Sequence, residues 1–372
     1  MIIAVNTRLR KNEQPDGYEK FLFTCLGQLT KKYPQHQFLF IFDKPYAENL
    51  SFTKNVLPLV AGPETSNSLR LQYWFNFKIP ALLRRYKADV FFSMEGICSL
   101  RTKKPQCLAV TDLGFLQQPA LQKKWLAGFY KKFTPAFLAK AKSIVTVSGF
   151  AKSVLIDHYK INADRVDVIY PGVDEIFKPM DWDEKEVIKE KKADGKAYFL
   201  FSGDINSNSN HINLLKAFSF FKKRQKSNMM LLIAGRADEQ FVKDLKTYKF
   251  RDEVKLLENL STEELAKITA AAYAMVYPVF YSDLALPALQ AMKCNTPVIV
   301  SNTCALPSIC GNATLYCNPG DFKDIAENLM LVFKDEDKVK ELVAAGKVQI
   351  QKHNWENAAA KLMQSIQKAF DN

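Results

Sequence analysis

Short apolar runs alternate with longer segments of helical periodicity along the whole chain. Apolar runs bounded by polar or turn-forming residues predict buried strands, and a 3.6-residue apolar period predicts amphipathic helices. In the first part of the chain the predicted strands are Ile2–Val5, Phe38–Phe42, Val90–Phe92, Leu108–Val110, Ile144–Val147 and Val166–Ile169. The predicted helices lie between them, near 17–32, 69–86, 120–142 and 149–160.

A second alternation follows the charged segment 174–195, which contains Pro179 and Trp182. Its predicted strands are Ala197–Gly203, Met229–Ala234, Val254–Leu257, Ala274–Tyr277 and Val298–Ser301. Its predicted helices lie near 211–225, 237–248, 261–271, 286–294, 321–334 and 336–352. A last helix is expected from Trp355 to Phe370, after the cap residue Asn354.

Strands and helices that alternate in this way fold as doubly wound α/β domains, with helices on both faces of a parallel sheet. We therefore expect two Rossmann-like domains, at 1–175 and 196–354, joined by a linker at 176–195. The helix at about 355–372 could pack back on the first domain. Ligands of such domains bind at the carboxyl ends of the strands.

Composition is that of a globular protein without a metal site. The 7 cysteines include no Cys-x-x-Cys pair, and the 4 histidines show no metal-ligand spacing, so neither disulfides nor a bound metal or other cofactor is expected. The first residues, Met1–Asn6, resemble a buried strand more than a signal peptide. No apolar run has the length of a membrane span, so a cytoplasmic location is expected.

The net charge of +13 favours anionic partners such as nucleotide phosphates or anionic lipid surfaces. No nucleic-acid-binding motif is present, so nucleic acid is not an expected partner. The segment 123–142 interleaves lysines with aromatic residues. Two interpretations stay open for it: a helix at the inner face of a membrane, which would make the protein peripheral, or an ordinary amphipathic helix with a solvated basic face.

The most specific pattern lies in residues 277–302, where a strand leads into a helix that starts at Leu286-Pro287 and then into another strand. The positions that form its frame are Pro278, Leu286, Pro287, Leu289, Ala291, Met292, Cys294, Pro297, Val298 and Ile299. This frame resembles the donor-sugar motif of family 4 (group 1) retaining glycosyltransferases. Further similar stretches cover nearly the whole chain: Ile3–Arg8, Ala88–Ser93, Thr111–Phe115, Ile144–Lys152, Val168–Val173, Asn210–Phe218, Ala234–Arg236, Pro307–Ala313 and Asn318–Asp321.

The resemblance implies the GT-B fold, in which two Rossmann-like domains face each other across a cleft. It also implies transfer of a hexosyl group from a nucleotide-sugar, such as a UDP- or GDP-hexose, to a glycan or lipid acceptor. The implied donor-binding positions are Gly203, Asn208, Ser209, Arg236, Asp283, Leu286 and Gln290. The positions implied nearest to the reacting sugar are Thr111, Asp112 and Ser282.

Several of these positions depart from the family pattern. Asn208 and Ser209 stand where the family has an Arg and a Lys that face the diphosphate, and Ser282 and Gln290 replace its two glutamates. Cations stabilise the charge that grows on a departing diphosphate, and the glutamates accept hydrogen bonds from sugar hydroxyls. Other replaced positions are Asp283 and Ala285 for turn glycines, Thr111 for a histidine, Gly149 for a glutamate, and Asp16–Lys20 for a glycine-rich loop.

Two hypotheses follow from the intact frame and the replaced residues. In the first, catalysis is weak or lost, and the protein binds a glycan, a lipid or a protein partner, for instance an active glycosyltransferase. In the alternative, the chain is an active glycosyltransferase of cell-surface polysaccharide synthesis with a rebuilt donor pocket. Arg236 and Lys293 would then meet the phosphates, and Asp112, Ser282, Asp283 and Gln290 would hold the sugar.

Overall fold

The computed structural model describes residues 1–8, 17–46, 52–117, 124–206 and 208–372. The chain forms two compact units. The first comprises Met1–Gly172 together with Asn354–Asn372, and the second comprises Val173–His353.

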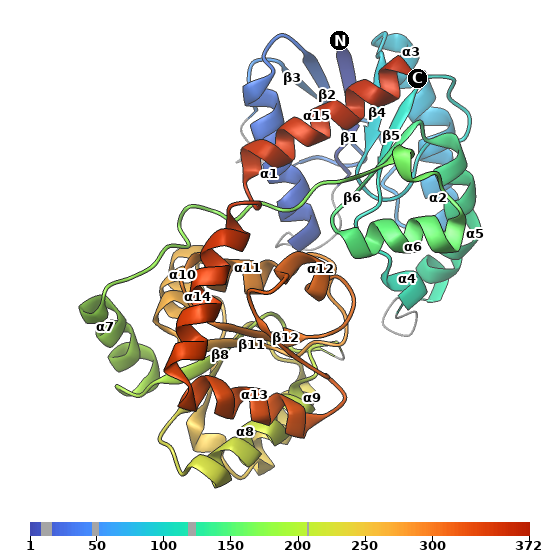
Figure 1. The fold of residues 1–372 in the computed structure, drawn as a ribbon. Helices are drawn as coiled ribbons and strands as arrows, with labels where there is room; N and C mark the ends of the chain where they lie inside the picture. The colour runs from blue at the N-terminus through green and yellow to red at the C-terminus, as the bar shows by residue number, and fades with distance from the viewer. Residues whose placement is uncertain (9–16, 47–51, 118–123, 207) are drawn as a thin grey trace. The chain divides into compact units, whose positions relative to one another are not determined.

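The first unit is built on a parallel sheet in the order β3-β2-β1-β4-β5-β6-β7 (Figure 1). Its strands are β1 (Ile2–Asn6), β2 (Gln37–Phe42), β3 (Val56–Val60), β4 (Val90–Ser93), β5 (Gln106–Ala109), β6 (Ser143–Thr146) and β7 (Val166–Val168). Strand β3 was not predicted, because its residues are only partly buried and include Pro58. Proline is tolerated there because β3 is the edge strand of the sheet.

Helices cover this sheet, and all of them except the short α4 lie where the apolar periodicity predicts a helix. They are α1 (Gly17–Lys32), α2 (Ser68–Tyr73), α3 (Ile79–Arg85), α4 (Gly114–Gln117), α5 (Lys124–Lys140), α6 (Gly149–Tyr159) and α15 (Trp355–Asp371). A π-helical turn, η1 (Trp74–Lys78), joins α2 to α3, so the single helix predicted near 69–86 has a wide turn at its centre. The buried side chains of α2, η1, α3, α4, α5 and α6 join those of the strands in one apolar core.

Helix α15, which comes last along the chain, packs against α1 and against β5 and β6 (Figure 1). The Oγ of Ser143 on β6 donates a hydrogen bond of 2.7 Å to the Ser365 carbonyl. Ser365 Oγ in turn donates to the Asp167 carboxylate at 2.8 Å. At the start of α15, Trp355 lies so close to Gly172 that a Cβ on the glycine would come within 2.5 Å of the indole. Residues 354–372 therefore complete the first unit.

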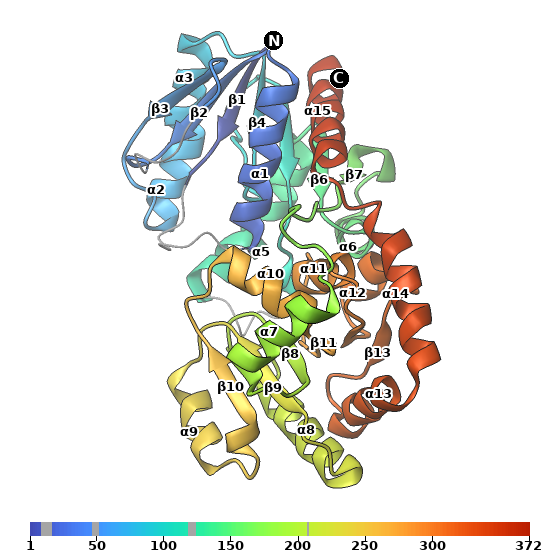
Figure 2. The same ribbon diagram turned by 90° about the vertical axis from the view of Figure 1, so that its left-hand side faces the viewer.

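The second unit has a parallel sheet in the order β10-β9-β8-β11-β12-β13, and Figure 2 shows β10 beside β9 at one edge. Its strands are β8 (Tyr198–Ser202), β9 (Met230–Ala234), β10 (Val254–Leu257), β11 (Ala274–Tyr277), β12 (Val298–Ser301) and β13 (Leu315–Cys317). Its helices are α7 (Trp182–Ala193), α8 (His211–Gln225), α9 (Glu239–Thr247), α10 (Thr262–Ala271), α11 (Leu286–Lys293), α12 (Leu306–Cys310), α13 (Phe322–Lys334) and α14 (Glu336–Ile350). The segment 176–195 lies in this unit, where α7 packs against α10.

None of the described helices combines the length and the apolar character that crossing a bilayer requires. In the segment 123–142, Phe129, Tyr130 and Phe137 are buried in the core of the first unit. Lys131 and Lys132 are exposed, as is nearly half of the Trp125 side chain. Most aromatic side chains of this segment therefore act as core residues, as in an ordinary amphipathic helix.

Candidate functional site

The order of strands in the second sheet defines where a ligand can bind. From β8 the chain winds outward through β9 to β10, and it then returns to the other side of β8 as β11. The loops that follow β8 and β11 therefore diverge at the carboxyl edge of the sheet, and such a switch point is the usual ligand site of open α/β sheets. These two loops contain residues 203–210 and 278–285 and hold most of the predicted donor positions.

Hydrogen bonds join the two loops. Asn208 Nδ2 donates to the Tyr281 carbonyl at 2.7 Å, and the Phe280 amide donates to the Asn208 carbonyl at 3.1 Å. Asn208 Oδ1 is buried and accepts no hydrogen bond in the described structure. The structure thus places Asn208 directly beside the 280–283 turn, although it has no positive charge to offer a phosphate.

Asn210 fixes the end of the first loop and the start of α8. It has a left-handed backbone with φ of 57°, and its Nδ2 donates to the carbonyls of Pro278 and Pro319 at 2.7 Å each. The buried Ser209 Oγ donates to the Asn206 carbonyl at 2.8 Å. Both side chains hold the loop in place, so neither Ser209 nor Asn210 presents a cation or a free donor.

Arg236 lies beside this loop because the β8 and β9 loops are in close backbone contact. The Ile205 amide donates to the Arg236 carbonyl at 2.7 Å, and a Cβ on Gly235 would lie 2.2 Å from the Gly203 carbonyl oxygen. The Arg236 guanidinium is exposed and binds Asp204 at 2.8 Å. Partial burial opposes ionisation of Asp204, but its hydrogen bonds to Arg236 outweigh this and lower its pKa.

The turn before α11 holds Ser282, Asp283 and Ala285. Ala285 is fully buried with a left-handed φ of 50°, a conformation that favours glycine, and it caps the start of α11. Its amide donates to Ser282 Oγ at 3.3 Å. The buried Asp283 accepts a hydrogen bond from the Tyr281 hydroxyl. The replaced glycine position therefore keeps the glycine-like backbone in this chain.

Helix α11 directs its N-terminus at this turn and its C-terminus away from it. Leu286 and Gln290 are half-buried and one turn apart, so they share a face of the helix. Lys293, in the last turn, binds Glu175 at 2.6 Å and the Val173 carbonyl at 3.0 Å. It is held at the opposite end of α11 from the turn, which argues against its predicted contact with the phosphates.

The remaining predicted positions, Thr111 and Asp112, follow β5 in the first unit. Thr111 is buried, and Asp112 accepts a hydrogen bond of 2.6 Å from the Gly114 amide at the start of α4. The predicted glycine-loop replacement at Asp16–Lys20 begins outside the described residues.

Sequence reasoning missed a buried polar cluster at the switch point of the first sheet, between β1 and β4. Arg8 binds Glu95 through two hydrogen bonds of 2.7 and 2.8 Å, and its Nη1 donates to Thr65 Oγ1 at 2.8 Å. The Thr65 hydroxyl donates to Asp43 at 2.5 Å. Burial acts to lower the pKa of Arg8. The charge of Glu95 and its hydrogen bonds act in the opposite direction and are stronger, so the pKa of Arg8 is raised. The sequence signal that could have revealed this cluster is a charged residue within two positions of the end of each strand: Arg8 after β1, Asp43 after β2 and Glu95 after β4.

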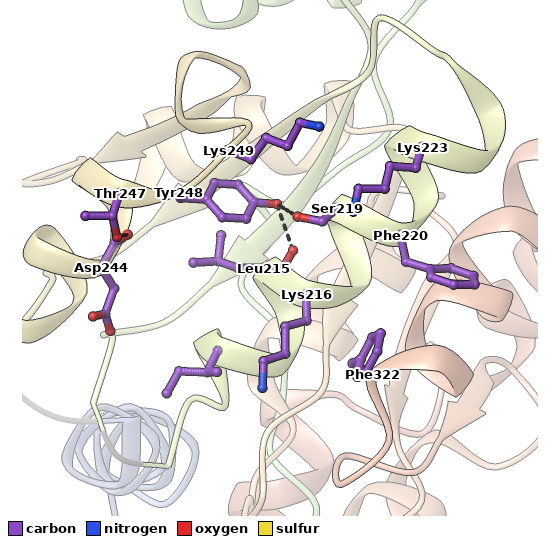
Figure 3. Close-up of a pocket in the computed structure, with 11 residues that line it drawn as sticks. Leu215, Lys216, Ser219, Phe220, Lys223, Asp244, Thr247, Tyr248, Lys249 and Phe322 are labelled. Atoms are coloured by element: carbon purple, nitrogen blue, oxygen red, sulfur yellow. Dashed lines mark hydrogen bonds between the residues drawn. The ribbon is translucent and has the colours of Figure 1, made fainter.

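A separate hollow of about 640 Å³ lies on the second unit between α8, α9 and the start of α13 (Figure 3). On its floor, Ser219 Oγ donates to the Tyr248 hydroxyl, which itself donates to the Leu215 carbonyl at 2.7 Å. Its lining includes Lys216, Lys223 and Lys249 but none of the predicted donor positions.

The described residues contain no group of three or more His, Cys, Asp or Glu side chains that could hold a metal ion. A family model for group 1 glycosyl transferases matches residues 183–349, and a model for glycosyltransferase family 4 matches residues 17–176.

Two relatives by sequence are named as mannosyltransferases. The chain is 26% identical over 286 residues to the O-antigen chain mannosyltransferase B of Escherichia coli, covering 75% of this chain and 74% of the relative. It is 27% identical over 292 residues to the O-antigen chain mannosyltransferase RfbU of Salmonella typhimurium, covering 75% and 76%.

Solved structures share the fold at low identity. A sucrose-phosphate synthase from Thermosynechococcus elongatus superposes with a TM-score of 0.79 at 18% identity, over 100% of this chain and 99% of that one. HepE from Anabaena, solved in complex with UDP-glucose, superposes with a TM-score of 0.75 at 15% identity, over 99% of each chain. The fold is therefore GT-B, as the sequence predicts.

Proposed function

Because the chain belongs to the family 4 (group 1) glycosyltransferases, we propose that it transfers a hexosyl group from a nucleotide-sugar to a glycan or lipid acceptor during cell-surface polysaccharide synthesis. The observation that carries this proposal is the joined pair of loops at the β8–β11 switch point, next to the start of α11. The two O-antigen mannosyltransferases among its relatives support the same class of product and a hexose donor.

In this proposal the diphosphate of the donor lies at the N-terminus of α11. The first turn of a helix presents unpaired amide groups and the positive end of its dipole, both of which stabilise an anion. Arg236, which the backbone contact with Ile205 brings beside the altered loop, is the cation that would take the place of the missing pair, and Asp204 competes for it. Gln290, one turn into α11, would accept or donate a hydrogen bond to the nucleotide ribose.

The hypothesis of weak or lost catalysis comes from the replaced residues, and the relatives favour the active alternative. One structural observation fits a binding role instead: Asp204 pairs with Arg236, which would leave the donor loop with little net positive charge. Measuring nucleotide binding first, and turnover second, distinguishes the two hypotheses.

The first test is calorimetric titration of the protein with UDP, GDP and their hexose conjugates, for which we expect micromolar binding of one nucleotide. Asp204→Asn should strengthen that binding by freeing Arg236, and Arg236→Ala should weaken it by about tenfold or more. Gln290→Ala should weaken it by about two- to tenfold, the worth of one neutral hydrogen bond. The control is Lys293→Ala at the far end of α11, which should leave binding unchanged.

Binding should be followed by transfer assays with candidate glycan and lipid acceptors. Absence of heat with every nucleotide would overturn the proposal and favour the non-catalytic hypothesis. Binding without turnover of any acceptor would indicate a sensor or partner subunit, and isolation of protein partners would then be the next step.

A further inference from the structure

The outer surface of the first unit carries an exposed apolar stripe that the proposed function does not use. It consists of Leu69, Tyr73 and Phe77, whose exposed fractions are 78%, 45% and 48%. The three side chains lie on α2 and the π turn η1 and repeat every four residues. Large apolar side chains at this exposure are unusual on one continuous face, because each leaves apolar area in water.

The π turn aligns the stripe. In an α-helix a step of four residues overshoots one full turn by about 40°, so a four-residue repeat drifts around the helix. In η1 the Ile79 amide bonds to the Trp74 carbonyl five residues before it, so this turn holds more residues than an α-helical turn. Four residues in this wider turn rotate less than four residues in an α-helix. The step from Tyr73 to Phe77 therefore offsets part of the roughly 40° rotation that the step from Leu69 to Tyr73 introduces. The rings of Tyr73 and Phe77 stack at 5.5 Å as a result.

The segment that carries this stripe and the loop that contacts it are rich in cations and contain no acidic residue. Residues 65–88 carry Arg70, Lys78, Arg84, Arg85 and Lys87, and residues 99–105 carry Arg101, Lys103 and Lys104. Most of these side chains are exposed, and none of the eight forms an ion pair in the described structure. Such a density of uncompensated charge opposes folding slightly and is typical of a surface that meets an anion.

The second segment is fixed against the first. The Leu100 amide donates to Asn76 Oδ1 at 2.9 Å, so a side chain of the π turn holds the basic loop in place. The Arg101 guanidinium then lies 4.3 Å from the centre of the Phe77 ring. A cation stacked on an exposed ring places charge and apolar area side by side.

From this arrangement we propose that the stripe Leu69–Tyr73–Phe77 and its bordering cations form a docking surface for an anionic lipid bilayer. Aromatic and leucine side chains insert at the boundary between headgroups and acyl chains, while lysine and arginine side chains reach the lipid phosphates. The choice of a bilayer follows from charge complementarity: the two segments carry charge of one sign only, together with an exposed apolar stripe. This surface differs from the segment 123–142, whose aromatic side chains are mostly buried.

The test is flotation of the purified protein with vesicles of phosphatidylcholine alone or mixed with phosphatidylglycerol. We expect binding to the anionic vesicles only, and release when the salt concentration is raised. Arg70→Glu combined with Arg101→Glu should weaken binding at least about 25-fold, because each cation near the bilayer contributes about fivefold. Tyr73→Ser combined with Phe77→Ser should also weaken it, with less effect on its salt dependence.

The matched control is Lys243→Glu with Lys246→Glu, two exposed positions on α9 that give the same change in net charge. It should retain most of the binding, and thermal unfolding should show that all variants are folded. Absence of binding to anionic vesicles would overturn the proposal and leave an acidic protein as the occupant to test. An equal loss in the control would overturn it too, because net charge alone would then explain the binding.

Discussion

His211 illustrates how a single residue near the donor loop responds to its surroundings. It begins α8, its ring packs edge-on against Phe241 at 5.3 Å, and its Nδ1 lies 3.3 Å from Ser209 Oγ. Burial lowers the pKa of His211, although Asp238 and Asp244 act in the opposite direction. As a replacement for the missing cations it is therefore unsuitable, because the folded structure favours its neutral form.

The lowered pKa of His211 predicts a pH dependence of stability. As the pH falls, the unfolded chain protonates this histidine before the folded chain does. The contribution of neutral His211 to the free energy of unfolding is therefore complete above the pKa of the unfolded chain, and it is lost as the pH falls toward the pKa of the folded chain. His211→Gln should therefore flatten the decline in the free energy of unfolding between about pH 7.5 and 5.5. Urea titrations across this range measure the slope, with His158→Gln at an exposed position as the control. An unchanged slope would contradict the prediction.

At the scale of single elements, Asn210 holds three loops together at the switch point of the second sheet. Its amide donates to carbonyls that follow β11 and β13, and it lies itself in the loop after β8. Asn210→Asp would place a carboxylate against two carbonyl oxygens, of which the Pro278 oxygen loses its side-chain donor and the Pro319 oxygen keeps only that of Asn213. We expect the free energy of unfolding to fall by about 2–4 kcal/mol, measured by urea denaturation.

The control for this prediction is Asn67→Asp at the start of α2. There the side chain only accepts a hydrogen bond, from the Arg70 amide, and a carboxylate keeps that bond. This substitution should change stability by no more than about 0.5 kcal/mol. Equal losses in the two variants would show that the donor role of Asn210 does not matter.

The elements also show what the sequence could and could not predict. Long amphipathic segments such as 211–225 and buried runs such as Val298–Ser301 were found with the predicted boundaries. The edge strands β3 and β13 were missed because each is only partly buried, which weakens the apolar signal, and because β3 contains Pro58. The π turn at Trp74–Lys78 has no periodic signature of its own, because it inserts within an otherwise helical pattern.

For the candidate site, the positions of the motif residues could be predicted from the sequence, but the residues that they contact in the folded chain could not. The sequence gives Arg236 as a free cation, and only the folded backbone brings Asp204 next to it. Similarly, nothing local in the sequence pairs Arg8 with Glu95, because those residues meet only when β1 and β4 lie side by side. The roles of the predicted donor positions stay predictions until a nucleotide is shown to bind.

At the scale of the whole molecule, the first unit depends on a helix that is distant in the chain. Ile366 on α15 is fully buried in that unit. Ile366→Ala should lower the free energy of unfolding of the first unit by about 2–4 kcal/mol, through lost burial and the cavity left behind. Gln364→Ala, at an exposed position of the same helix, should have little effect. Chemical denaturation followed by fluorescence measures both, and a neutral result for Ile366→Ala would mean that α15 is not part of the cooperative core.

The return of α15 to the first unit also affects how the protein is made. A ribosome releases residues 1–172 well before residues 354–372, and the whole second unit emerges between them. Until α15 is synthesised, the surfaces of α1, β5 and β6 that it covers stay exposed in the nascent first unit. The second unit, by contrast, is complete as soon as residue 353 has emerged. Order of synthesis and order of completion are thus reversed, and the newborn chain exposes an apolar surface to chaperones for as long as translation of the second unit takes.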